Sequence, residues 1–389
     1  MHLVRSLDMG GLEQVVVDLV NGMTRRGIEC HIGCLNRAGI WINRVTCAGI
    51  WEGCLNERNP WRVVGDLRNY LQRHGIELVN SHNVQPHFFG VFSTAGSSRP
   101  LVHTKHGRNW IEGGQPEWRR SVWWWKSRQL SRFSKAIIAV SHDAEDVAVR
   151  NEHVPQVKVG TILNGIDVQR YAPLVCAGES RITTRQRVRE KLGLAADAFI
   201  VGSVGRLSFE KNYEMLVRSV TAFKKEVPNA MLVLVGDGDS SRSIEREIAL
   251  AGLGDSVRLP GRQEAVTDWL HALDVFCLSS ISEGTSIALL EACACELMSV
   301  VTDVGGNAEI VQHGISGWVV PPRDENQYTQ ALLEVWRRRA QFEQFGREAR
   351  ARVVNKYSLD VMVDAYLKVY RNVLAGQPPY DDSGVLILG

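Results

Sequence analysis

The second half of the chain alternates apolar segments of strand length with amphipathic segments of helix length. Residues 198–207 read as a buried strand and residues 212–227 as a helix, and the alternation continues to a strand at 299–306. Strands that alternate with helices in this way predict a parallel sheet with helices on both faces. This alternation is the strongest constraint that the sequence places on the fold, and it predicts an α/β domain.

The first half shows a looser version of the same alternation. A short strand at 2–7 precedes a helix at 10–27. Further strands with polar ends are expected at 29–35, 78–83, 101–107 and 136–141. The first half therefore predicts a second domain of the same class.

The length and a break in the pattern divide the chain. A chain of 389 residues is too long for one ordinary core, and the alternation is lost near 171–187. We expect an N-terminal domain at 1–175, a C-terminal domain at 188–355 and a helix within 356–376.

Composition excludes several classes of protein. The chain is 44% hydrophobic and 23% charged, which is typical of a soluble globular protein. A formal net charge of +2 gives no reason to expect a nucleic-acid partner, and no apolar run approaches the roughly 18 residues of a membrane-spanning helix. The first residues show no charged leader followed by an apolar run, and the eight cysteines form no CxxC pair. We therefore expect a cytoplasmic protein with reduced thiols.

Glycine-rich or polar clusters follow the expected strands of the second half. They lie at 205–206, 236–238, 261–262, 279–284 and 305–306. Ligands of parallel α/β sheets bind at the carboxyl ends of the strands. These clusters therefore predict a binding site along one edge of the sheet.

Two glutamates, Glu283 and Glu291, flank the start of an expected helix. Eight helical residues span about 12 Å and leave the two side chains about 80° apart, so one small group cannot easily contact both. Between them, Gly284, Thr285 and Ser286 would present unpaired N–H groups, which bind phosphate at a helix N-terminus. A nucleotide sugar fits this pattern, with phosphate in the middle and hydroxyl-rich groups at both ends. The alternative is that the two glutamates have no ligand: one caps the helix and the other lies on its solvent-exposed face.

Four other positions support a phosphate-binding site. Arg206 ends one strand and Lys211 begins the next helix, so two cations could clamp a diphosphate. Gly10 and Gly11 follow the first strand of the other half, where bare backbone could approach a ligand. His106 ends another N-terminal strand and is expected to point toward the same cleft, although a single histidine is more often structural.

Taken together, these residues resemble glycosyltransferase family 4. The resemblance covers nearly the whole chain, and the pair of glutamates spaced as E-x7-E is its most specific part. The matching segments are GGLEQVVVDL, HTKHG, AIIAVS, ILNGID, VGRLSFEKN, LVLVGDG, RLPGR, DVFCLSSISEGTSIALLEACA and TDVGGNAEIV.

The resemblance implies a GT-B fold, in which two Rossmann-like domains with parallel sheets face each other across a central cleft. It implies transfer of a hexose from a UDP- or GDP-linked donor with retention of anomeric configuration, and no cofactor. The helix at 358–376 would cross back to the N-terminal domain. Activities of this kind serve polysaccharide and lipopolysaccharide biosynthesis.

The resemblance also assigns roles to the residues singled out above. Glu291 would bind the ribose, Glu283 the transferred sugar, and Arg206 with Lys211 the diphosphate. The amides of Ser286 and Ile287 would lie near the diphosphate, Gly11 would line the donor site, and His106 would lie near the sugar. The loop at Gly261 and Arg262 would border the base, and Gly205 is a further substrate-binding candidate.

The two cations and a helix N-terminus can offset the charge of a leaving diphosphate by themselves. We therefore expect no essential metal ion, and no D-x-D acidic pair at the site. Two alternatives stay open. An epimerase of the same fold would release an altered nucleotide sugar without any acceptor, and a non-catalytic sensor would only bind the nucleotide sugar.

One segment bears on the acceptor. Between Lys105 and Lys135 the chain has eight Lys or Arg residues against two Glu. Helical periodicity over 117–133 places Trp118, Val122, Trp125 and Phe133 on one buried stripe and Trp124 among arginines on the polar side. An exposed tryptophan among arginines suits an anionic membrane surface. We therefore expect a lipid-linked or polysaccharide glycan as the acceptor. The alternatives to membrane contact are that Trp124 packs on another loop or that the basic surface binds an anionic glycan.

Overall fold

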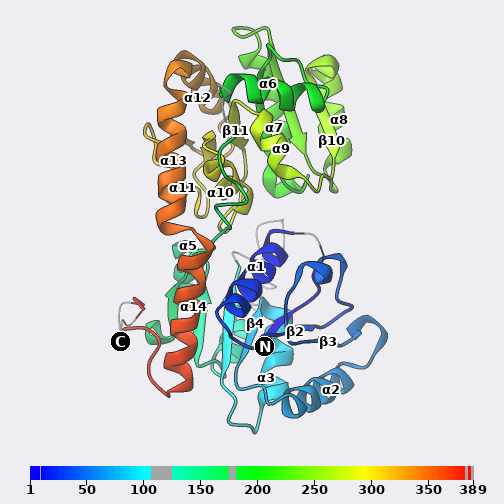
Figure 1. The fold of residues 1–389 in the computed structure, drawn as a ribbon, viewed down its shortest axis with the longest axis vertical. Coiled ribbons are helices and arrows are strands. Elements are labelled where there is room, and N and C mark those ends of the chain that lie inside the picture. Colours follow the sequence, from blue (N-terminus) through cyan, green and yellow to red (C-terminus); the bar gives the residue numbers. More distant parts are fainter. Residues whose placement is uncertain (9, 107–124, 175–180, 382–383, 387–389) are drawn as a thin grey trace. The chain divides into compact units, whose positions relative to one another are not determined.

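The computed structural model describes residues 1–8, 10–106, 125–174, 181–381 and 384–386. The chain forms two compact units (Figure 1). Unit 1 comprises Met1–Ile166 and Ser358–Gly389, and unit 2 comprises Asp167–Tyr357. The chain therefore passes between the units twice, and its C-terminal segment belongs to the unit that contains the N-terminus.

The sheet of unit 1 is parallel throughout, with the strand order β3-β2-β1-β4-β5-β6-β7. Its strands are β1 (His2–Val4), β2 (His31–Cys34), β3 (Gly49–Glu52), β4 (Val79–His82), β5 (Leu101–Lys105), β6 (Ala136–Ala139) and β7 (Val159–Thr161). Because all strands run in one direction, their carboxyl ends lie along one edge.

Helices cover both faces of this sheet. They are α1 (Gly11–Arg25), α2 (Pro60–Arg73), α3 (Val84–Thr94), α5 (His142–Asp146) and α14 (Leu359–Leu374), and residues 125–131 are also helical. Apolar residues of α1 recur at helical spacing and are buried, and a Cβ added to Gly22 of α1 would lie 2.6 Å from Val363 of α14. The side chain of Ser358 caps α14 by accepting the Val361 N–H. The two helices therefore pack against each other.

Buried polar side chains of β4 and β5 alternate between the two faces. On the α14 face, the Asn80 amide donates to the Tyr370 hydroxyl over 2.6 Å, and the Thr104 hydroxyl donates to Asn80 over 3.0 Å. On the α3 face, Ser81 Oγ lies 3.0 Å from His87 Nδ1 and 3.3 Å from His103 Nδ1. Strand geometry puts successive side chains on opposite faces, so one pair of strands holds two separate polar networks.

Unit 2 has a six-stranded parallel sheet in the order β10-β9-β8-β11-β12-β13. The strands are β8 (Phe199–Val204), β9 (Ala230–Val235), β10 (Val257–Gly261), β11 (Val275–Leu278), β12 (Met298–Thr302) and β13 (Gly317–Val320). The helices are α6 (Arg181–Lys191), α7 (Tyr213–Phe223), α8 (Ser241–Leu250), α9 (Val266–Ala272), α10 (Ile287–Ala294), α11 (Asn307–Ile310), α12 (Glu325–Arg337) and α13 (Phe342–Lys356).

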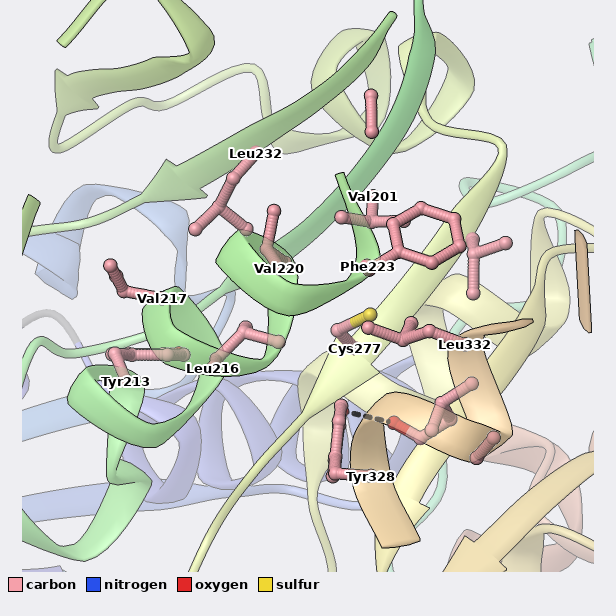
Figure 2. Packing of buried hydrophobic residues seen from close by; sticks show 14 of the residues in the cluster. Val201, Tyr213, Leu216, Val217, Val220, Phe223, Leu232, Cys277, Tyr328 and Leu332 are labelled. Atoms are coloured by element: carbon pink, nitrogen blue, oxygen red, sulfur yellow. Dashed lines mark hydrogen bonds between the residues drawn. The ribbon is translucent and has the colours of Figure 1, made fainter. Parts of the chain in front are cut away.

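Alternate residues of these strands form the main core of unit 2. Figure 2 shows Leu216, Val220 and Phe223 of α7 beside Cys277 of β11 and Leu332 of α12. All five are essentially inaccessible to solvent. The α7 face of the sheet is therefore a packed apolar layer, which leaves the carboxyl edge as the polar part of the domain.

Three strands were not expected from the sequence, namely β3, β7 and β13. In β3 only Trp51 is buried, so the strand shows neither a long apolar run nor a clean alternation. β7 has three residues, which is too short to give a periodic signal. β3 was therefore missed because little of its surface is buried, and β7 because it is too short.

The expected buried stripe over 117–133 is wrong for the two members that the structure describes. Trp125 and Phe133 are 61% and 65% exposed, whereas Ser127 and Ser131 are buried. The buried side is polar because Ser127 donates to Glu152, which in turn pairs with Lys105 inside the unit. Trp118, Val122 and Trp124 lie outside the described residues.

Within the described part of the chain, seven cysteines are free thiols. They are Cys30, Cys34, Cys47, Cys54, Cys277, Cys293 and Cys295. Among the same residues, no helix is both long enough and apolar enough to span a membrane.

Five histidines of unit 1 predict how its stability depends on pH. Burial lowers the pKa of His2, His87 and His106 to about 3, and also holds the pKa of His82 and His103 well below the usual value. The unfolded chain therefore binds more protons than the fold between pH 6.5 and about 3, and stability must fall as pH falls through that window. Each histidine should contribute about 1.4 kcal/mol per pH unit. Urea unfolding followed at pH 7.5, 6.5, 5.5 and 4.5 measures this slope.

A matched pair of variants assigns the slope to these groups. His87→Gln should make it shallower, whereas the same change at His142, whose side chain is 68% exposed, should leave it unaltered. A stability that stays constant from pH 7.5 to 5.5 in the unchanged protein would contradict the prediction.

Candidate functional site

The two glutamates flank the start of α10 as the sequence predicts. Glu283 lies in the turn after β11, and Glu291 is the fifth residue of α10, which begins at Ile287. Ser286 occupies the N-cap position, but its side chain makes no capping hydrogen bond. Its Oγ is buried and has no partner among the described residues. A buried hydroxyl without a partner is costly, so this atom is well placed to bind a ligand.

Lys211 and Glu283 form an ion pair. Lys211 Nζ lies 2.6 Å from Glu283 Oε1, and the side chains are 17% and 10% exposed. The Ser280 hydroxyl donates to the same carboxylate oxygen over 2.6 Å. Burial disfavours the Lys211 ammonium, but Glu283 and then Tyr213 outweigh it and raise the lysine pKa above its usual value. Lys211 is therefore a fixed positive charge at neutral pH.

Further hydrogen bonds join the loops that carry this ion pair. Ser279 Oγ donates to the carbonyls of Lys211 and Asn212 over 2.8 and 3.0 Å. The N–H of Ile281 donates to the carbonyl of Glu210 over 2.8 Å. The loop after β8 and the loop after β11 therefore form one connected structure.

Backbone packs against backbone between neighbouring strand ends. A Cβ on Gly236, whose φ is +147°, would lie 1.9 Å from the Gly205 carbonyl oxygen. A Cβ on Gly305, whose φ is +54°, would lie 2.3 Å from the Glu283 carbonyl oxygen. Only glycine fits at these two positions. The N–H of Gly306 also donates to the Gly284 carbonyl over 2.9 Å, which holds the turn before α10.

The other predicted residues of unit 2 lie along the same edge. Gly261 ends β10, and its carbonyl accepts from the Gly236 N–H over 2.9 Å. Arg206 and Arg262 are exposed, and Arg206 makes no salt bridge within the described ranges. Thr285 stands immediately before the Ser286 cap. The structure thus brings the predicted residues of this unit to adjacent strand ends.

Glu291 has a different environment from Glu283. Its side chain is buried, and Oε1 accepts a hydrogen bond of 2.6 Å from the Tyr171 hydroxyl. Tyr171 and Ser280 were not singled out from the sequence. Tyr171 stands near the expected domain break, where no periodicity or motif marks it, whereas Ser280 lies within the polar cluster at 279–284 without being singled out.

The candidates of unit 1 lie at the carboxyl ends of β1 and β5. Gly10 is the N-cap of α1 and Gly11 its first residue, while His106 directly follows β5. His106 Nε2 lies 2.8 Å from His82 Nδ1, and His82 Nε2 lies 3.1 Å from His2 Nδ1. His106 Nδ1 is buried and has no partner among the described residues. Burial keeps the pKa of these rings low, so they form a chain of neutral imidazoles.

The expectation that no D-x-D pair stands at a strand end is wrong. Asp237, Gly238 and Asp239 form such a tripeptide directly after β9. Asp237 Oδ1 accepts from the Gly238 N–H over 2.7 Å and from the Ser241 hydroxyl over 3.3 Å, contacts that shape the turn into α8. Among the residues that the structure describes, no group of three or more His, Cys, Asp or Glu side chains could hold a metal ion.

Two family models match the chain, one in each half. The model described as Glycosyltransferase Family 4 matches residues 9–170, and the model described as Glycosyl transferases group 1 matches residues 184–352. Together they cover both parallel-sheet units.

Curated relatives are similar over most of the chain. A UDP-Gal:alpha-D-GlcNAc-diphosphoundecaprenol alpha-1,3-galactosyltransferase of Escherichia coli is 24% identical over 80% of this chain and 79% of its own length. A D-inositol 3-phosphate glycosyltransferase of Thermobispora bispora is 24% identical over 84% of this chain and 82% of its own length.

Solved structures share the architecture. Alr3699/HepE of Anabaena, in complex with UDP, has a TM-score of 0.81 at 20% identity and covers 95% of this chain and 99% of that one. WaaG, a glycosyltransferase involved in lipopolysaccharide biosynthesis, has a TM-score of 0.73 at 15% identity over 96% of this chain and 99% of that one. With two parallel-sheet α/β domains in the GT-B fold and a family model on each, this chain belongs to glycosyltransferase family 4.

Proposed function

We propose that this chain is a retaining, metal-independent hexosyltransferase. It would transfer a sugar from a UDP- or GDP-linked donor to a hydroxyl of a lipid-linked or polysaccharide glycan. The observation that carries the proposal is the buried Ser286 Oγ at the start of α10, which has no partner among the described residues and stands three residues after Glu283, the partner of Lys211.

The diphosphate of such a donor fits at the start of α10. The helix N-terminus presents unpaired N–H groups and a partial positive charge, both of which attract phosphate. Ser286 Oγ adds a hydroxyl donor. A lysine ammonium has three N–H donors, and within the described residues only Glu283 accepts from Lys211, so the ammonium can also bind a phosphate oxygen.

The same groups would act on the reaction. As the bond between sugar and diphosphate breaks, negative charge grows on the leaving phosphate. Lys211 and Arg206 stabilise that charge, and a cation fixed before the reaction needs no reorganisation. Glu283, in contact with Lys211, would meet the sugar, while Glu291 in α10 would accept hydrogen bonds from the ribose.

The relatives support the donor and acceptor classes. Alr3699/HepE was solved with UDP and with UDP-glucose. The E. coli relative is named for UDP-Gal and for a lipid-diphosphate acceptor, whereas the T. bispora relative is named for D-inositol 3-phosphate. A UDP-linked compound is named for both Alr3699/HepE and the E. coli relative. By analogy with the E. coli relative, we favour a lipid-linked glycan as the acceptor.

Two rival functions have distinct signatures. An epimerase would convert the nucleotide sugar without acceptor and release no nucleoside diphosphate. A non-catalytic sensor would bind the donor without turnover. A thermal-shift screen of UDP- and GDP-sugars, followed by analysis of the products formed with each stabilising compound, separates the three.

The two glutamates should fail in different ways when neutralised. Glu283→Gln should lower turnover about 100-fold or more, yet keep or strengthen UDP binding, because Lys211 loses its competing carboxylate. Glu291→Gln should weaken UDP binding about tenfold through the ribose. Calorimetry with UDP and assays of donor hydrolysis distinguish these effects, with exposed Glu343→Gln as the control. Equal and negligible losses at both sites would return the pair to a capping role.

Lys211 should be required for chemistry, and a metal should not. Lys211→Met should lower turnover roughly 100-fold, since loss of one fixed partner of the developing charge costs about 3 kcal/mol. Arg206→Met should act in the same direction, and exposed Lys225→Met should have no effect. Activity of the unchanged protein should survive EDTA. Loss of activity in EDTA, with recovery on adding magnesium, would refute the metal-independent mechanism.

A basic and aromatic surface of unit 1 supports binding to an anionic membrane. Its described members are the exposed Trp125 and Phe133, with four exposed cations at Lys126, Arg128, Arg132 and Lys135. Aromatic rings beside lysine and arginine suit the headgroup region of an anionic leaflet. The protein would then meet a lipid-linked acceptor from the cytoplasmic side of the inner membrane.

Anionic vesicles should therefore capture the protein at low salt and release it as salt rises, because each basic residue near the surface contributes about 1 kcal/mol that salt screens. Trp125→Ala and Phe133→Ala combined with Arg128→Glu and Arg132→Glu should abolish capture and leave donor hydrolysis unchanged. A control with Leu250→Ala, Arg242→Glu and Arg246→Glu on exposed α8 should still sediment with the vesicles. Capture that persists in the unit 1 variant would favour a soluble acceptor.

A further inference from the structure

The buried contact between Tyr171 and Glu291 joins the first residues of unit 2 to the helix of the candidate site. The phenol donates to Glu291 Oε1 over 2.6 Å, and the two residues are 5% and 8% exposed. A hydrogen bond between two nearly inaccessible groups is hard to exchange for water. This contact is therefore a fixed part of the unit.

The backbone around Tyr171 is fastened independently of its hydroxyl. Arg350 of α13 donates to the carbonyl of Tyr171 over 3.2 Å and to that of Val168 over 3.3 Å, and it also donates to the carbonyl of Ala294, the last residue of α10. His271 of α9 lies 3.1 Å, through Nε2, from the carbonyl of Ala172. Hydrogen bonds to backbone carbonyls before and after Tyr171 therefore help to hold its side chain against α10.

We propose that Tyr171 is a positioning residue that sets the orientation of the Glu291 carboxylate for the ribose of the donor. The inference rests on the proposed function, because it requires that Glu291 accept hydrogen bonds from ribose hydroxyls. It adds a residue outside the E-x7-E pair, and a specific task for it.

The physical reason is the freedom of a glutamate side chain. Glu291 has three rotatable side-chain bonds, and the carboxylate must adopt one orientation before it can accept from a ribose hydroxyl. A phenol hydroxyl bound to Oε1 selects that orientation in advance, so donor binding does not have to order the side chain. The phenol adds no charge, and a carboxylate that accepts one hydrogen bond at Oε1 has further lone pairs that can accept from a ribose hydroxyl.

The opposite assignment is that the phenol occupies the place of a ribose hydroxyl and has to leave when the donor binds. The burial of Tyr171 and the hydrogen bonds from Arg350 and His271 to the backbone around it favour the first assignment, because displacement would break a buried hydrogen bond. The two assignments predict opposite changes in affinity on removal of the phenol hydroxyl.

The test uses Tyr171→Phe, which keeps the ring and removes only the hydroxyl. Calorimetry on the full chain with UDP, 2′-deoxy-UDP, GDP and 2′-deoxy-GDP gives both affinity and ribose discrimination. Tyr171→Phe should weaken binding of the ribonucleotide about threefold to tenfold and shrink the ratio between ribose and deoxyribose forms by a similar factor. Tyr328→Phe is the matched control, since it removes another buried phenol hydroxyl of unit 2, one that donates to the Val300 carbonyl, and should leave that ratio unchanged.

A double variant isolates the route through Glu291. In Glu291→Gln the ribose discrimination should already be largely lost, so adding Tyr171→Phe should change it no further. Tighter ribonucleotide binding in Tyr171→Phe would overturn the proposal in favour of displacement, and an unchanged ratio would reduce Tyr171 to a structural role. If the unchanged protein binds neither UDP nor GDP, the proposed function fails instead, and that result is distinct from the other two.

Discussion

The ion pair between Lys211 and Glu283 is the interaction on which the candidate site depends. It joins the loop after β8 to the loop after β11, and both side chains are mostly withdrawn from water. Separating two such charges would leave each without a partner in a poorly solvated place, which is costly. Hydrogen bonds from Ser280 and Ser279 add to the same junction. The start of α10, including Ser286, is therefore fixed by electrostatics from outside the helix, since no side chain caps it.

Close backbone contacts at the strand ends complement this ion pair. Gly236 lies against Gly205, and Gly305 lies against Glu283, at distances where a Cβ would clash. Bare backbone at these points lets the neighbouring loops approach each other closely. The charges set which loops meet, and the glycines determine how closely they can approach.

Sequence reasoning located the edge of the sheet and the residues on it, but not how they pair. The alternation of buried strands and amphipathic helices placed β8 to β12, and the polar clusters marked their carboxyl ends. The ion pair between Lys211 and Glu283 was not predicted, because loop conformations that bring residues 72 positions apart into contact leave no periodic signal. The contact of Tyr171 with Glu291 was not predicted for the same reason. In unit 1 the expected burial of Trp125 and Phe133 is wrong, since the buried side of residues 125–131 faces the polar pair of Lys105 and Glu152.

Two buried polar groups beside the candidate residues differ in charge state, although unit 1 also buries the ion pair of Lys105 and Glu152. In unit 1, His2, His82 and His106 bond one another as neutral rings, because burial makes protonation unfavourable. In unit 2, Lys211 stays protonated because Glu283 outweighs its burial. A neutral ring suits contact with uncharged hydroxyls, whereas a diphosphate needs a permanent cation. In the free protein Glu283 binds the Lys211 ammonium, which a donor phosphate would also contact in the proposed function. The ion pair therefore fixes the position of the lysine charge before a ligand binds. In the proposed function, the carboxylate that balances Lys211 in the free protein would lie beside the donor phosphate and the departing sugar.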